Sequence, residues 1–374
     1  MKSVYRCYAS CAFGIEGVLS AELKKLDMEN VAAQDARVYF DADMDGIARA
    51  NLFLRTADRV YLVLNEFYAE TFDQLFETIK ALPLADFLPS DARFPVDANA
   101  VQSTLMSVSD IQSVSKKAVV RALSRVYKQD RFAEDGSVFH LFVNIYKNKV
   151  TVALNTSGNG LNRRGYRLKN VQAPLKETLA AALLSIARWH TREFHDPMCG
   201  SGTITIEAAM QAANMAPGLK RRFDAQSWHN EGKEAFRIAR EDAKSRIVRP
   251  QMRICASDID AKSLKLAREH AHNMDVAEFI DFSVRDVKDF AQPEAAAAII
   301  TNPPYAVRLG EEKQVERLTR DMGKAFLRLN DVVVFILSAN GGFEQQYGKK
   351  ADKRRKLYNG NIKCTYYQYF RKEK

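Results

Sequence analysis

Hydrophobic and polar positions alternate in two different ways along the chain, and the change of pattern divides it into two parts. Up to about residue 156, strand patterns with a period of two alternate with helical patterns. The clearest are a strand at 3–10, a helix at 15–26, and a strand–turn–strand over 138–157 with its reversal at residues 147–149. Small alternating units of this kind predict an α+β, ferredoxin-like module.

The second part begins after a stretch without apolar periodicity. Residues 157–172 are rich in Gly, Asn and Arg, which indicates a linker and a domain boundary. Beyond it, strands and helices alternate, and the strands lack a polar face, as is typical of parallel strands covered on both sides. This pattern predicts a doubly wound, Rossmann-like α/β sheet. A polar insert at 214–249, helical in its later half, interrupts it.

Composition and charge narrow the classes of function. The chain has 374 residues, enough for two or three domains, and its net charge of +10 favours a polyanionic partner such as nucleic acid or an anionic membrane surface. Its five scattered cysteines have no zinc-ligand spacing and indicate free thiols in a reducing compartment. There is no signal-peptide pattern and no apolar run long enough to span a bilayer. We therefore expect a cytoplasmic protein without a metal site or a membrane partner.

The first chemistry-bearing segment is "HDPMCGSGT". Asp196 ends a predicted strand, Gly200 and Gly202 flank Ser201, and Thr203 opens a helix. Glycines at such a turn let the backbone approach a ligand closely. Neither the three-glycine dinucleotide fingerprint nor a phosphate loop is present. An acid before the turn instead favours a ligand with an ammonium group, such as S-adenosylmethionine (SAM), although a tight turn without a ligand explains this segment equally well when it is taken alone.

Two further acids stand at predicted strand ends. Asp258 can accept hydrogen bonds from both hydroxyls of a ribose, and Ile259 beside it can pack on an adenine. Asp260 has the position of a helix N-cap. Asp286 can accept a hydrogen bond from the adenine amino group, and a capping or turn role is an equally simple interpretation.

The segment "NPPY" follows the apolar run "AAAAIIT". Asn302 and Pro303 each precede a proline and are held extended, and the prolines donate no hydrogen bond. A stiff segment therefore presents the Asn302 side-chain oxygen and the Pro303 carbonyl to the two hydrogens of an exocyclic amine, while Tyr305 stacks on the base. Two acceptors and alignment with a sulfonium methyl group would activate this weak nucleophile. The alternative is a Pro-Pro loop with no ligand.

These motifs, in this order, resemble the amino-directed SAM-dependent methyltransferases. Together with "CAFGIEGVLSAELKKL", "NRRGYR", "NMAPG" and "KLYNGNIKCTYYQYF", they make the whole chain similar to the THUMP-domain RNA guanine-N2 methyltransferases, single-module relatives of the bacterial 23S ribosomal-RNA enzyme RlmL. The resemblance implies a ferredoxin-like domain at 1–65, a THUMP RNA-binding domain at 66–156, the linker at 157–172 and a Rossmann-like catalytic domain at 173–374.

The resemblance also implies a role for individual residues. Those that would hold SAM are Asp196, Met198, Gly200, Ser201, Gly202, Thr203, Asp258, Ile259, Asp286, Pro174 and Glu177. Those that would hold the target amine are Asn302, Pro303, Pro304 and Tyr305. Relatives commonly continue with Gly-Glu where this chain has Ala306 and Val307, so an acid is missing beside the expected target.

An RNA substrate requires cations for its phosphates and a base that leaves the stack. The candidate phosphate contacts are Lys116, Lys117 and Arg121 on a predicted helix and Arg163, Arg164 and Arg167 in the linker. We expect methyl transfer to a guanine N2 amine in 23S ribosomal RNA. The alternatives are an adenine-N6 methyltransferase on RNA or DNA, because "NPPY" accommodates either amine, and an RNA-binding assembly factor that has lost catalysis.

Overall fold

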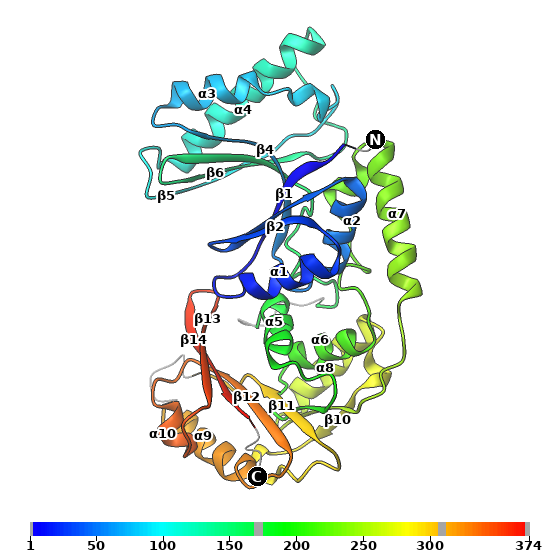
Figure 1. The fold of residues 1–374 in the computed structure, drawn as a ribbon, viewed down its shortest axis with the longest axis vertical. Coiled ribbons are helices and arrows are strands. Elements are labelled where there is room, and N and C mark those ends of the chain that lie inside the picture. Colours follow the sequence, from blue (N-terminus) through cyan, green and yellow to red (C-terminus); the bar gives the residue numbers. More distant parts are fainter. Residues whose placement is uncertain (1–2, 168–174, 306–311, 371–374) are drawn as a thin grey trace. The chain divides into compact units, whose positions relative to one another are not determined.

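The computed structural model describes residues 3–167, 175–305 and 312–370 (Figure 1). It contains two compact units, and each is built on its own seven-stranded sheet. Unit 1 comprises Met1–Cys11, Ser20–Leu161 and Arg221–Asp242, and unit 2 comprises Ala12–Leu19, Asn162–Lys220 and Ala243–Lys374.

The sheet of unit 1 has the strand order β2-β3-β1-β4-β7-β6-β5. Its strands are β1 (Tyr5–Ser10), β2 (Glu29–Gln34), β3 (Arg37–Ala42), β4 (Arg59–Tyr68), β5 (Val96–Val101), β6 (His140–Tyr146) and β7 (Lys149–Asn155). The single strand β4 pairs with β1 through residues 59–62 and with β7 through residues 61–68. It therefore joins the predicted ferredoxin-like and THUMP modules into one continuous sheet.

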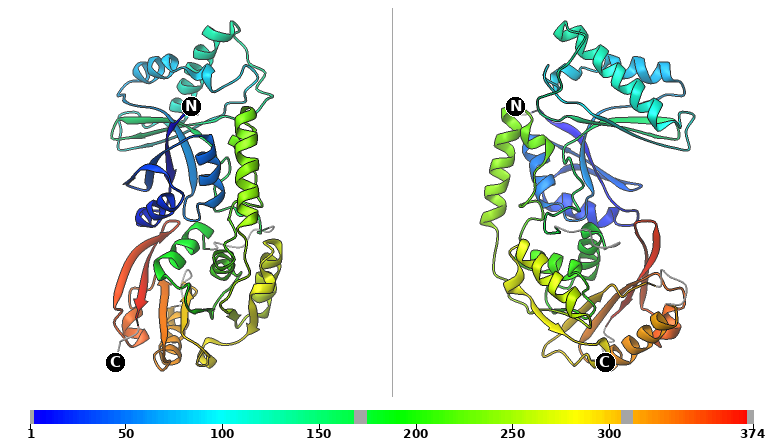
Figure 2. Two further views of the ribbon diagram at one scale, coloured as in Figure 1. Left: turned by 45° about the vertical axis from the view of Figure 1, so that its right-hand side comes forward. Right: turned by 180° about the vertical axis from the view of Figure 1, so that it is seen from behind.

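The helices of the N-terminal half cover one face of this sheet. They are α1 (Glu16–Lys25), α2 (Met44–Phe53), α3 (Phe72–Ala81) and α4 (Val108–Tyr127). Cys7, Leu62 and Leu154 are cross-strand neighbours on the covered face, and all three are buried. In Figures 1 and 2, α3 and α4 both lie on one side of β4, β5 and β6, and no helix of the described residues lies on the other side of these strands.

The sheet of unit 2 has the order β10-β9-β8-β11-β12-β14-β13, with β8 to β12 parallel and the final hairpin antiparallel. Its strands are β8 (Glu193–Asp196), β9 (Ile254–Asp258), β10 (Asp281–Val284), β11 (Ala297–Thr301), β12 (Val332–Ser338), β13 (Lys353–Asn359) and β14 (Ile362–Tyr369). This confirms the predicted Rossmann-like sheet. Because the parallel strands end at one edge, the loops that follow them are brought together there.

Helices cover both faces of the unit 2 sheet. They are α5 (Glu177–Ala187), α6 (Thr203–Ala212) and α8 (Ala261–Asn273) on one face, and α9 (Glu312–Phe326) and α10 (Phe343–Tyr347) on the other (Figure 1). The side chains of β12 alternate between these layers: Val334 and Ile336 pack with Phe326 of α9. On the opposite side, Phe335 of β12 stacks on Tyr366 of β14, whose hydroxyl donates to the Leu183 carbonyl of α5 over 3.1 Å. The absence of polar alternation in the sequence thus reflects burial on both faces.

The polar insert, which lies between the first and the second strand–helix pair of the Rossmann-like pattern, contains α7 (His229–Ser245). Residues 221–242 of this insert belong to unit 1. The Trp228 indole donates to the Val138 carbonyl over 2.7 Å, and its ring stacks on Phe139 with centroids 4.8 Å apart. A segment encoded within the catalytic half of the chain is therefore part of the core of the other unit.

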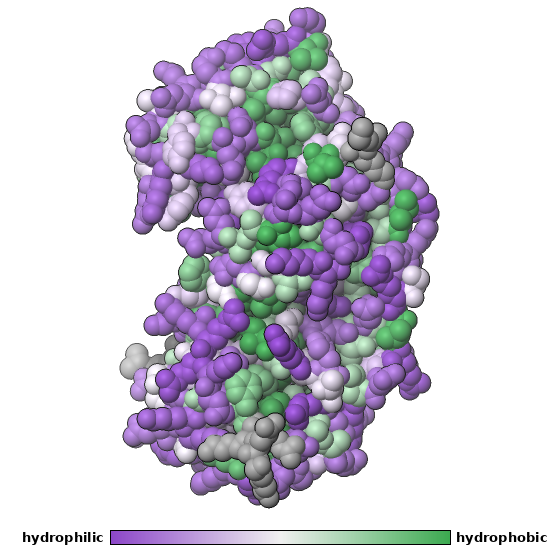
Figure 3. Space-filling view, viewed as in Figure 1, coloured by the Kyte–Doolittle hydropathy of each residue, from purple (hydrophilic) through white to green (hydrophobic). Residues whose placement is uncertain are grey.

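Hydrophilic side chains predominate on the face shown in Figure 3, and apolar ones are scattered among them. Within the described ranges, no helix combines the length and apolarity needed to cross a bilayer. The same residues hold no group of three or more His, Cys, Asp or Glu side chains that could bind a metal ion.

Candidate active site

A cavity of about 570 Å³ lies at the carboxyl edge of the unit 2 sheet. The loops after four parallel strands contribute to its lining. The predicted site residues that line it are Met198, Gly200, Asp258, Ile259, Asp286, Asn302 and Pro304. The structure therefore brings together residues that are up to 106 positions apart in the sequence, as the common edge of a parallel sheet requires.

The glycine turn after β8 fits closely against its surroundings on one side and is open on the other. Gly202 has φ +84°, and a Cβ there would lie 3.0 Å from the Cβ of Ala267 on α8. Gly200 has φ +53°, and a Cβ there would meet nothing within 4 Å, so its main chain is open to the cavity that it lines. Ile259 is 68% exposed and forms an apolar part of the same wall. These features fit a nucleoside with an apolar base face and a polar ribose.

Asp258 holds the glycine turn as well as facing the cavity. One of its carboxylate oxygens accepts from the Gly200 N–H over 2.8 Å, and the other accepts from the Asp260 N–H over 2.9 Å. Each oxygen keeps a further lone pair for a ribose hydroxyl. Asp260 is the N-cap of α8, accepting from the N–H groups of Lys262 and Ser263, which confirms its predicted role.

Asp286 has the capping role that the sequence left open and also lies at the cavity. It accepts from the Lys288 N–H over 3.1 Å and so caps the 3₁₀ turn η4 (Val287–Asp289). It also lines the cavity. The hydrogen bond from the Lys288 backbone and the ion pair with its side chain lower the pKa of Asp286, so its carboxylate is an ionised acceptor.

Asp196 does not line this cavity, and its role as a SAM ligand stays a prediction. It is 2% exposed, and its two oxygens accept from the hydroxyls of Thr301 over 2.8 Å and Thr205 over 3.4 Å. Burial raises the pKa of Asp196 to about 7. The carboxyl group therefore joins the ends of β8 and β11 and positions the loops that follow them.

The other described residues of the predicted SAM set do not line the cavity. The Ser201 carbonyl accepts from His270 over 3.0 Å, and the Thr203 hydroxyl accepts from Arg167. Glu177 is buried and pairs with Arg167 over 3.1 Å. Pro174, Ala306 and Val307 lie outside the described residues.

Two of the predicted RNA contacts point inward instead. Arg164 is 1% exposed, and its Nε lies 2.9 Å from Oε1 of the fully buried Glu207. Arg167 is held by Glu177 and Thr203. A buried charge is tolerated only beside a partner, and these partners hold both guanidinium groups inside unit 2. The prediction that Arg164 and Arg167 contact phosphates is therefore wrong in this structure.

The predicted basic helix presents only part of its charge to solvent. Lys116 lies 2.6 Å from Glu134 and donates to the Phe94 carbonyl, so its charge is partly compensated, and its phosphate contact stays a prediction. Lys117 and Arg121 are exposed on α4, and Arg125 follows them at the same spacing of four. Residues four apart lie on one face of a helix, so these three form a basic stripe. The linker residue Arg163 is also exposed.

The Asn302–Tyr305 segment continues directly from β11. The Tyr305 hydroxyl donates to the Asn302 side-chain oxygen, and Cys364 Sγ on β14 lies 3.6 Å from the Tyr305 oxygen. Burial raises the pKa of Tyr305, so its hydroxyl stays protonated and able to donate. Besides the stacking role expected from the sequence, Tyr305 therefore fixes the direction of the Asn302 amide, whose oxygen keeps one lone pair for another donor.

A second cavity of about 400 Å³ adjoins the same segment. Its lining includes Pro304, Tyr305, Glu312, Glu316, Asn340 and Gln346. Pro304 lines both cavities, so this segment is the rim between them. Glu312 and Glu316 were not among the predicted site residues, although two acids four apart on the helix just after "NPPY" are a usable signal.

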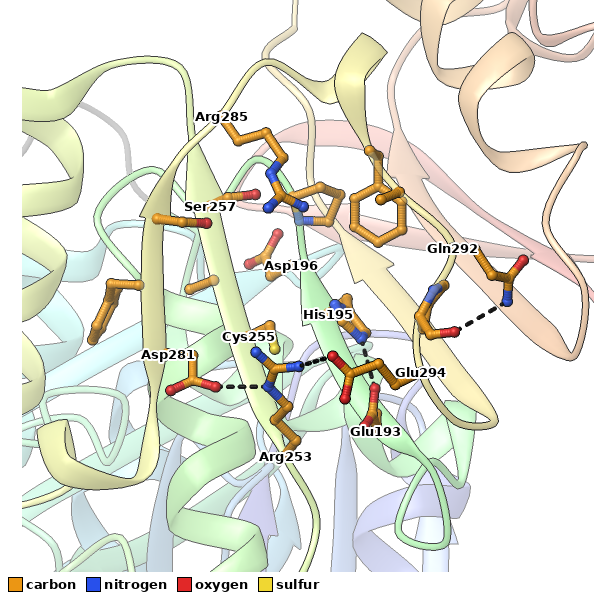
Figure 4. Close-up of a pocket in the computed structure, with 17 residues that line it drawn as sticks. Glu193, His195, Asp196, Arg253, Cys255, Ser257, Asp281, Arg285, Gln292 and Glu294 are labelled. Atoms are coloured by element: carbon orange, nitrogen blue, oxygen red, sulfur yellow. Dashed lines mark hydrogen bonds and ion pairs between the residues drawn. The ribbon is translucent and has the colours of Figure 1, made fainter.

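A third cavity, of about 410 Å³, lies over β8, β9 and β10 on a sheet face (Figure 4). Arg253 lies between Asp281, at 2.7 Å, and Glu294, at 3.5 Å, and His195 lies 3.4 Å from Glu193. The charge of Arg253 is thus compensated by two acids of the cavity. Asp196 is the one predicted site residue in its lining, so the chemistry of the "NPPY" rim belongs to the other two cavities.

Matches to family models agree with this arrangement. Residues 164–368 match the RMKL-like methyltransferase domain, residues 6–61 the RlmL ferredoxin-like domain and residues 69–155 the THUMP domain. The chain belongs to the RMKL-like methyltransferase family. Its order of domains, with ferredoxin-like and THUMP domains before the methyltransferase domain, is the one that the sequence resemblance implied.

Relatives with curated names are similar over nearly the whole chain. The chain is 42% identical to "Putative RNA methyltransferase YpsC" of Bacillus subtilis, over 98% of this chain and 96% of YpsC. It is 30% identical to "Ribosomal RNA large subunit methyltransferase K/L" of Shewanella frigidimarina over 97% of this chain. The chain spans about half the length of that K/L protein, 52% of it.

Solved structures give the same fold. SMU.472, described as "a putative methyltransferase complexed with SAH", is 36% identical with a TM-score of 0.94 over the whole of both chains. A "predicted N6-adenine-specific DNA methylase" from Listeria monocytogenes is 42% identical with a TM-score of 0.93, over 98% of this chain and 96% of that one. The complex with SAH, the product that SAM leaves after methyl transfer, agrees with SAM as the expected cofactor.

Proposed function

We propose that this protein transfers a methyl group from SAM to the exocyclic N2 amine of a guanine in large-subunit ribosomal RNA. The observation that carries the proposal is the shared rim. Asn302 and Pro304 line the cavity that contains Asp258, Ile259 and Asp286, and Pro304 also lines the second cavity. A base in the second cavity would reach the methyl donor only across this rim.

The rim residues activate the target amine by holding its hydrogens. When bound, SAM supplies an electrophilic methyl group on a sulfonium. The Asn302 side-chain oxygen and the Pro303 carbonyl accept one amino hydrogen each, which draws electron density onto nitrogen and holds its lone pair toward the sulfonium methyl group. As the N–C bond forms, the sulfonium leaves as a thioether and one amino hydrogen is released as a proton. Tyr305 keeps the Asn302 oxygen in place through its hydroxyl. Fixing the reacting groups in this way lowers the entropic part of the barrier.

The acids of the second cavity favour guanine over adenine. Next to its exocyclic amine, guanine carries an N1–H donor, whereas adenine has an N1 lone pair. The carboxylates of Glu312 and Glu316 line this cavity, and Glu316 is held by Arg320 at 2.9 Å. A carboxylate accepts hydrogen bonds but cannot donate them, so it attracts the guanine edge and repels that of adenine. This compensates for the acid missing at Val307.

The RNA substrate is inferred from the N-terminal half and from the relatives. The THUMP match covers residues 69–155, and the K/L relative is named as a ribosomal RNA methyltransferase. Lys117, Arg121 and Arg125 form an exposed stripe in the same region and are suited to phosphate contacts. The second candidate, adenine-N6 methylation, is favoured by the description of the similar Listeria structure.

Nucleoside analysis of RNA from a strain lacking the gene tests the proposal. We expect 23S RNA from this strain to lose one N2-methylguanosine and keep its N6-methyladenosine, and a plasmid copy of the gene should restore the modification. An Asn302→Ala copy is the matched control and should not restore it. Loss of N6-methyladenosine with intact N2-methylguanosine would establish the alternative. Failure of the purified protein to bind SAM in calorimetry would instead indicate an RNA-binding factor without catalysis.

A further inference from the structure

The uncovered face of the unit 1 sheet carries a row of side chains across four strands. Tyr68 of β4 is paired with Lys149 of β7, Lys149 with Tyr146 of β6, and Tyr146 with Val101 of β5. Directly paired residues project from the same face of a sheet. The row, which we call the tyrosine row, therefore consists of Tyr68, Lys149, Tyr146 and Val101.

The apolar members of the tyrosine row are open to solvent. Tyr68 is 73% exposed, Tyr146 44% and Val101 42%. The Lys147 ammonium group lies 5.3 Å from the centroid of the Tyr146 ring. Single exposed apolar residues are ordinary on a protein surface, but two tyrosines separated by one lysine on neighbouring strands form a contiguous aromatic and basic surface.

The residues next to the tyrosine row hold its strands firmly. Glu66 accepts from the hydroxyls of Tyr39 over 2.8 Å and Thr151 over 3.1 Å. Asn99 donates to Asn144 over 3.0 Å, which links β5 to β6. Because these hydrogen bonds tie the strands together, the exposed rings are presented by a rigid support.

The uncovered face as a whole has more positive than negative charge. Three of its four acids lie beside a basic residue or a histidine: Asp41 2.9 Å from Arg6, Glu66 3.1 Å from Lys149, and Asp97 2.8 Å from His140. The fourth acid, Glu29, is paired with Asp41. Three further cations, Arg37, Arg59 and Lys147, have no acid partner among the described residues. The excess cations suit a polyanion that lies across the face.

We propose that the tyrosine row binds a single-stranded segment of the RNA substrate, with bases stacked on Tyr68 and Tyr146 and the phosphates near Lys147 and Lys149. The inference rests on the proposed function in that it takes RNA as the substrate. The two rings are separated by two strand spacings, roughly 10 Å, which leaves each ring a base of its own. In a duplex the base faces are hidden within the stack, so the matching RNA is a loop or an unpaired strand.

Binding of a fluorescein-labelled oligouridine of 12 nucleotides to the full-length protein tests this role. Each aromatic–base stack contributes enough that Tyr68→Ala and Tyr146→Ala should each weaken binding by roughly 5- to 150-fold. Tyr68→Phe and Tyr146→Phe keep the ring and should bind within about twofold of wild type. Phe13→Ala removes a ring that is 56% exposed outside unit 1, and it should have no effect.

A second measurement separates stacking from loss of structure and from failure of the proposed function. For methyl transfer to 23S RNA from the deletion strain, the alanine variants should raise KM for RNA and leave kcat, KM for SAM and the circular-dichroism spectrum unchanged. If the alanine variants bind oligouridine as wild type does, or if wild type does not bind it, the inference is wrong even where guanine is methylated. If they lose binding while the modified base proves to be adenine, the inference stands and the proposed function fails.

Discussion

The two seven-stranded sheets of this protein place their polar chemistry on different surfaces. In unit 2, helices cover both faces, and the functional groups Asp258, Asp286 and Asn302 gather at the carboxyl edge of the parallel strands. In unit 1, helices cover one face, and polar and aromatic groups such as Tyr68 and Tyr146 lie on the other. The surface that a sheet offers to a ligand is thus the one that its helices leave bare.

The largest expected effect concerns the edge of the unit 2 sheet. Asn302→Ala should lower the rate of methyl transfer roughly 10³-fold, because it removes an acceptor that acts on the amine in the transition state. SAM affinity should change less than about twofold, since Asp258, Ile259 and Asp286 remain. Single-turnover transfer to RNA and calorimetric titration with SAM measure the two quantities. A collapse of SAM binding would show that the rim and the cofactor cavity do not act separately.

The next effect compares two neighbouring arginines. Arg164→Ala should lower the free energy of unfolding of unit 2 by about 3–5 kcal/mol, because it leaves the carboxylate of Glu207 buried without its cation. Arg163→Ala, at an exposed position, should change it by less than about 0.5 kcal/mol. Each unit contains one of the two tryptophans, so urea unfolding followed by Trp189 fluorescence in a Trp228→Phe background reports on unit 2. Equal effects of both substitutions would contradict the buried pair.

Removal of the Tyr305 hydroxyl should have a smaller effect on the same rim. Tyr305→Phe keeps the ring and loses the hydrogen bond to Asn302, so kcat should fall about five- to tenfold, the equivalent of one net hydrogen bond. KM for RNA and for SAM should stay the same, because the hydroxyl acts through Asn302. Cys364→Ala is the control, since the thiol contacts the hydroxyl but not the amide. An unchanged kcat would leave Tyr305 with a stacking role alone.

Asp196 should make the stability of unit 2 depend on pH. Folding raises its pKa to about 7, above the ordinary value of about 4, so the folded state binds the proton more tightly. The stabilisation is complete below about pH 4 and is lost as the pH rises through about 7. Urea unfolding between pH 4 and pH 8 should show a steeper fall in the wild type than in Asp196→Asn. Parallel profiles would mean that Asp196 is ionised in the folded protein.

The smallest effect concerns neighbouring cations on α4 of unit 1. Arg121→Ala should reduce the slope of log affinity against log salt for 23S RNA by about one, because one phosphate contact is lost. Lys116→Ala should change the slope less, since Lys116 lies 2.6 Å from Glu134, whereas the pair of Arg121 with Asp130 is longer, 3.7 Å, and more exposed. Filter binding between 50 and 200 mM salt measures the slopes. A slope that changes for Lys116 and not for Arg121 would reverse our assignment of the basic stripe.

Local features of this protein could be predicted well from its sequence. The Asp260 cap depends on main-chain groups two and three residues away, and it was predicted correctly. The Rossmann-like sheet was predicted from apolar strands that alternate with helices, because burial on both faces leaves such strands without polar positions. Asp258, Asp286 and Asn302 were found as candidates because each stands at the end of such a predicted strand.

Long-range partners could not be predicted in this way. From the sequence, Arg164 was interpreted as a surface cation within a polar linker. In the structure it is buried and pairs with Glu207, 43 residues away. Asp196 accepts a hydrogen bond from Thr301, which lies 105 residues away along the chain. Nothing in the local pattern of either residue distinguishes a charge that faces solvent from one that meets a distant partner.

The sequence by itself determined the stiffness of the Asn302–Tyr305 rim, since proline restricts its own backbone and that of the residue before it. Only the tertiary structure decided that a segment of the catalytic half completes the core of unit 1, that β4 joins two modules into one sheet, and that Tyr68 and Tyr146 lie in one row. Steric restriction acts between neighbours along the chain. Burial, ion pairing and strand register depend instead on which elements, distant in the sequence, pack against a residue in the folded protein.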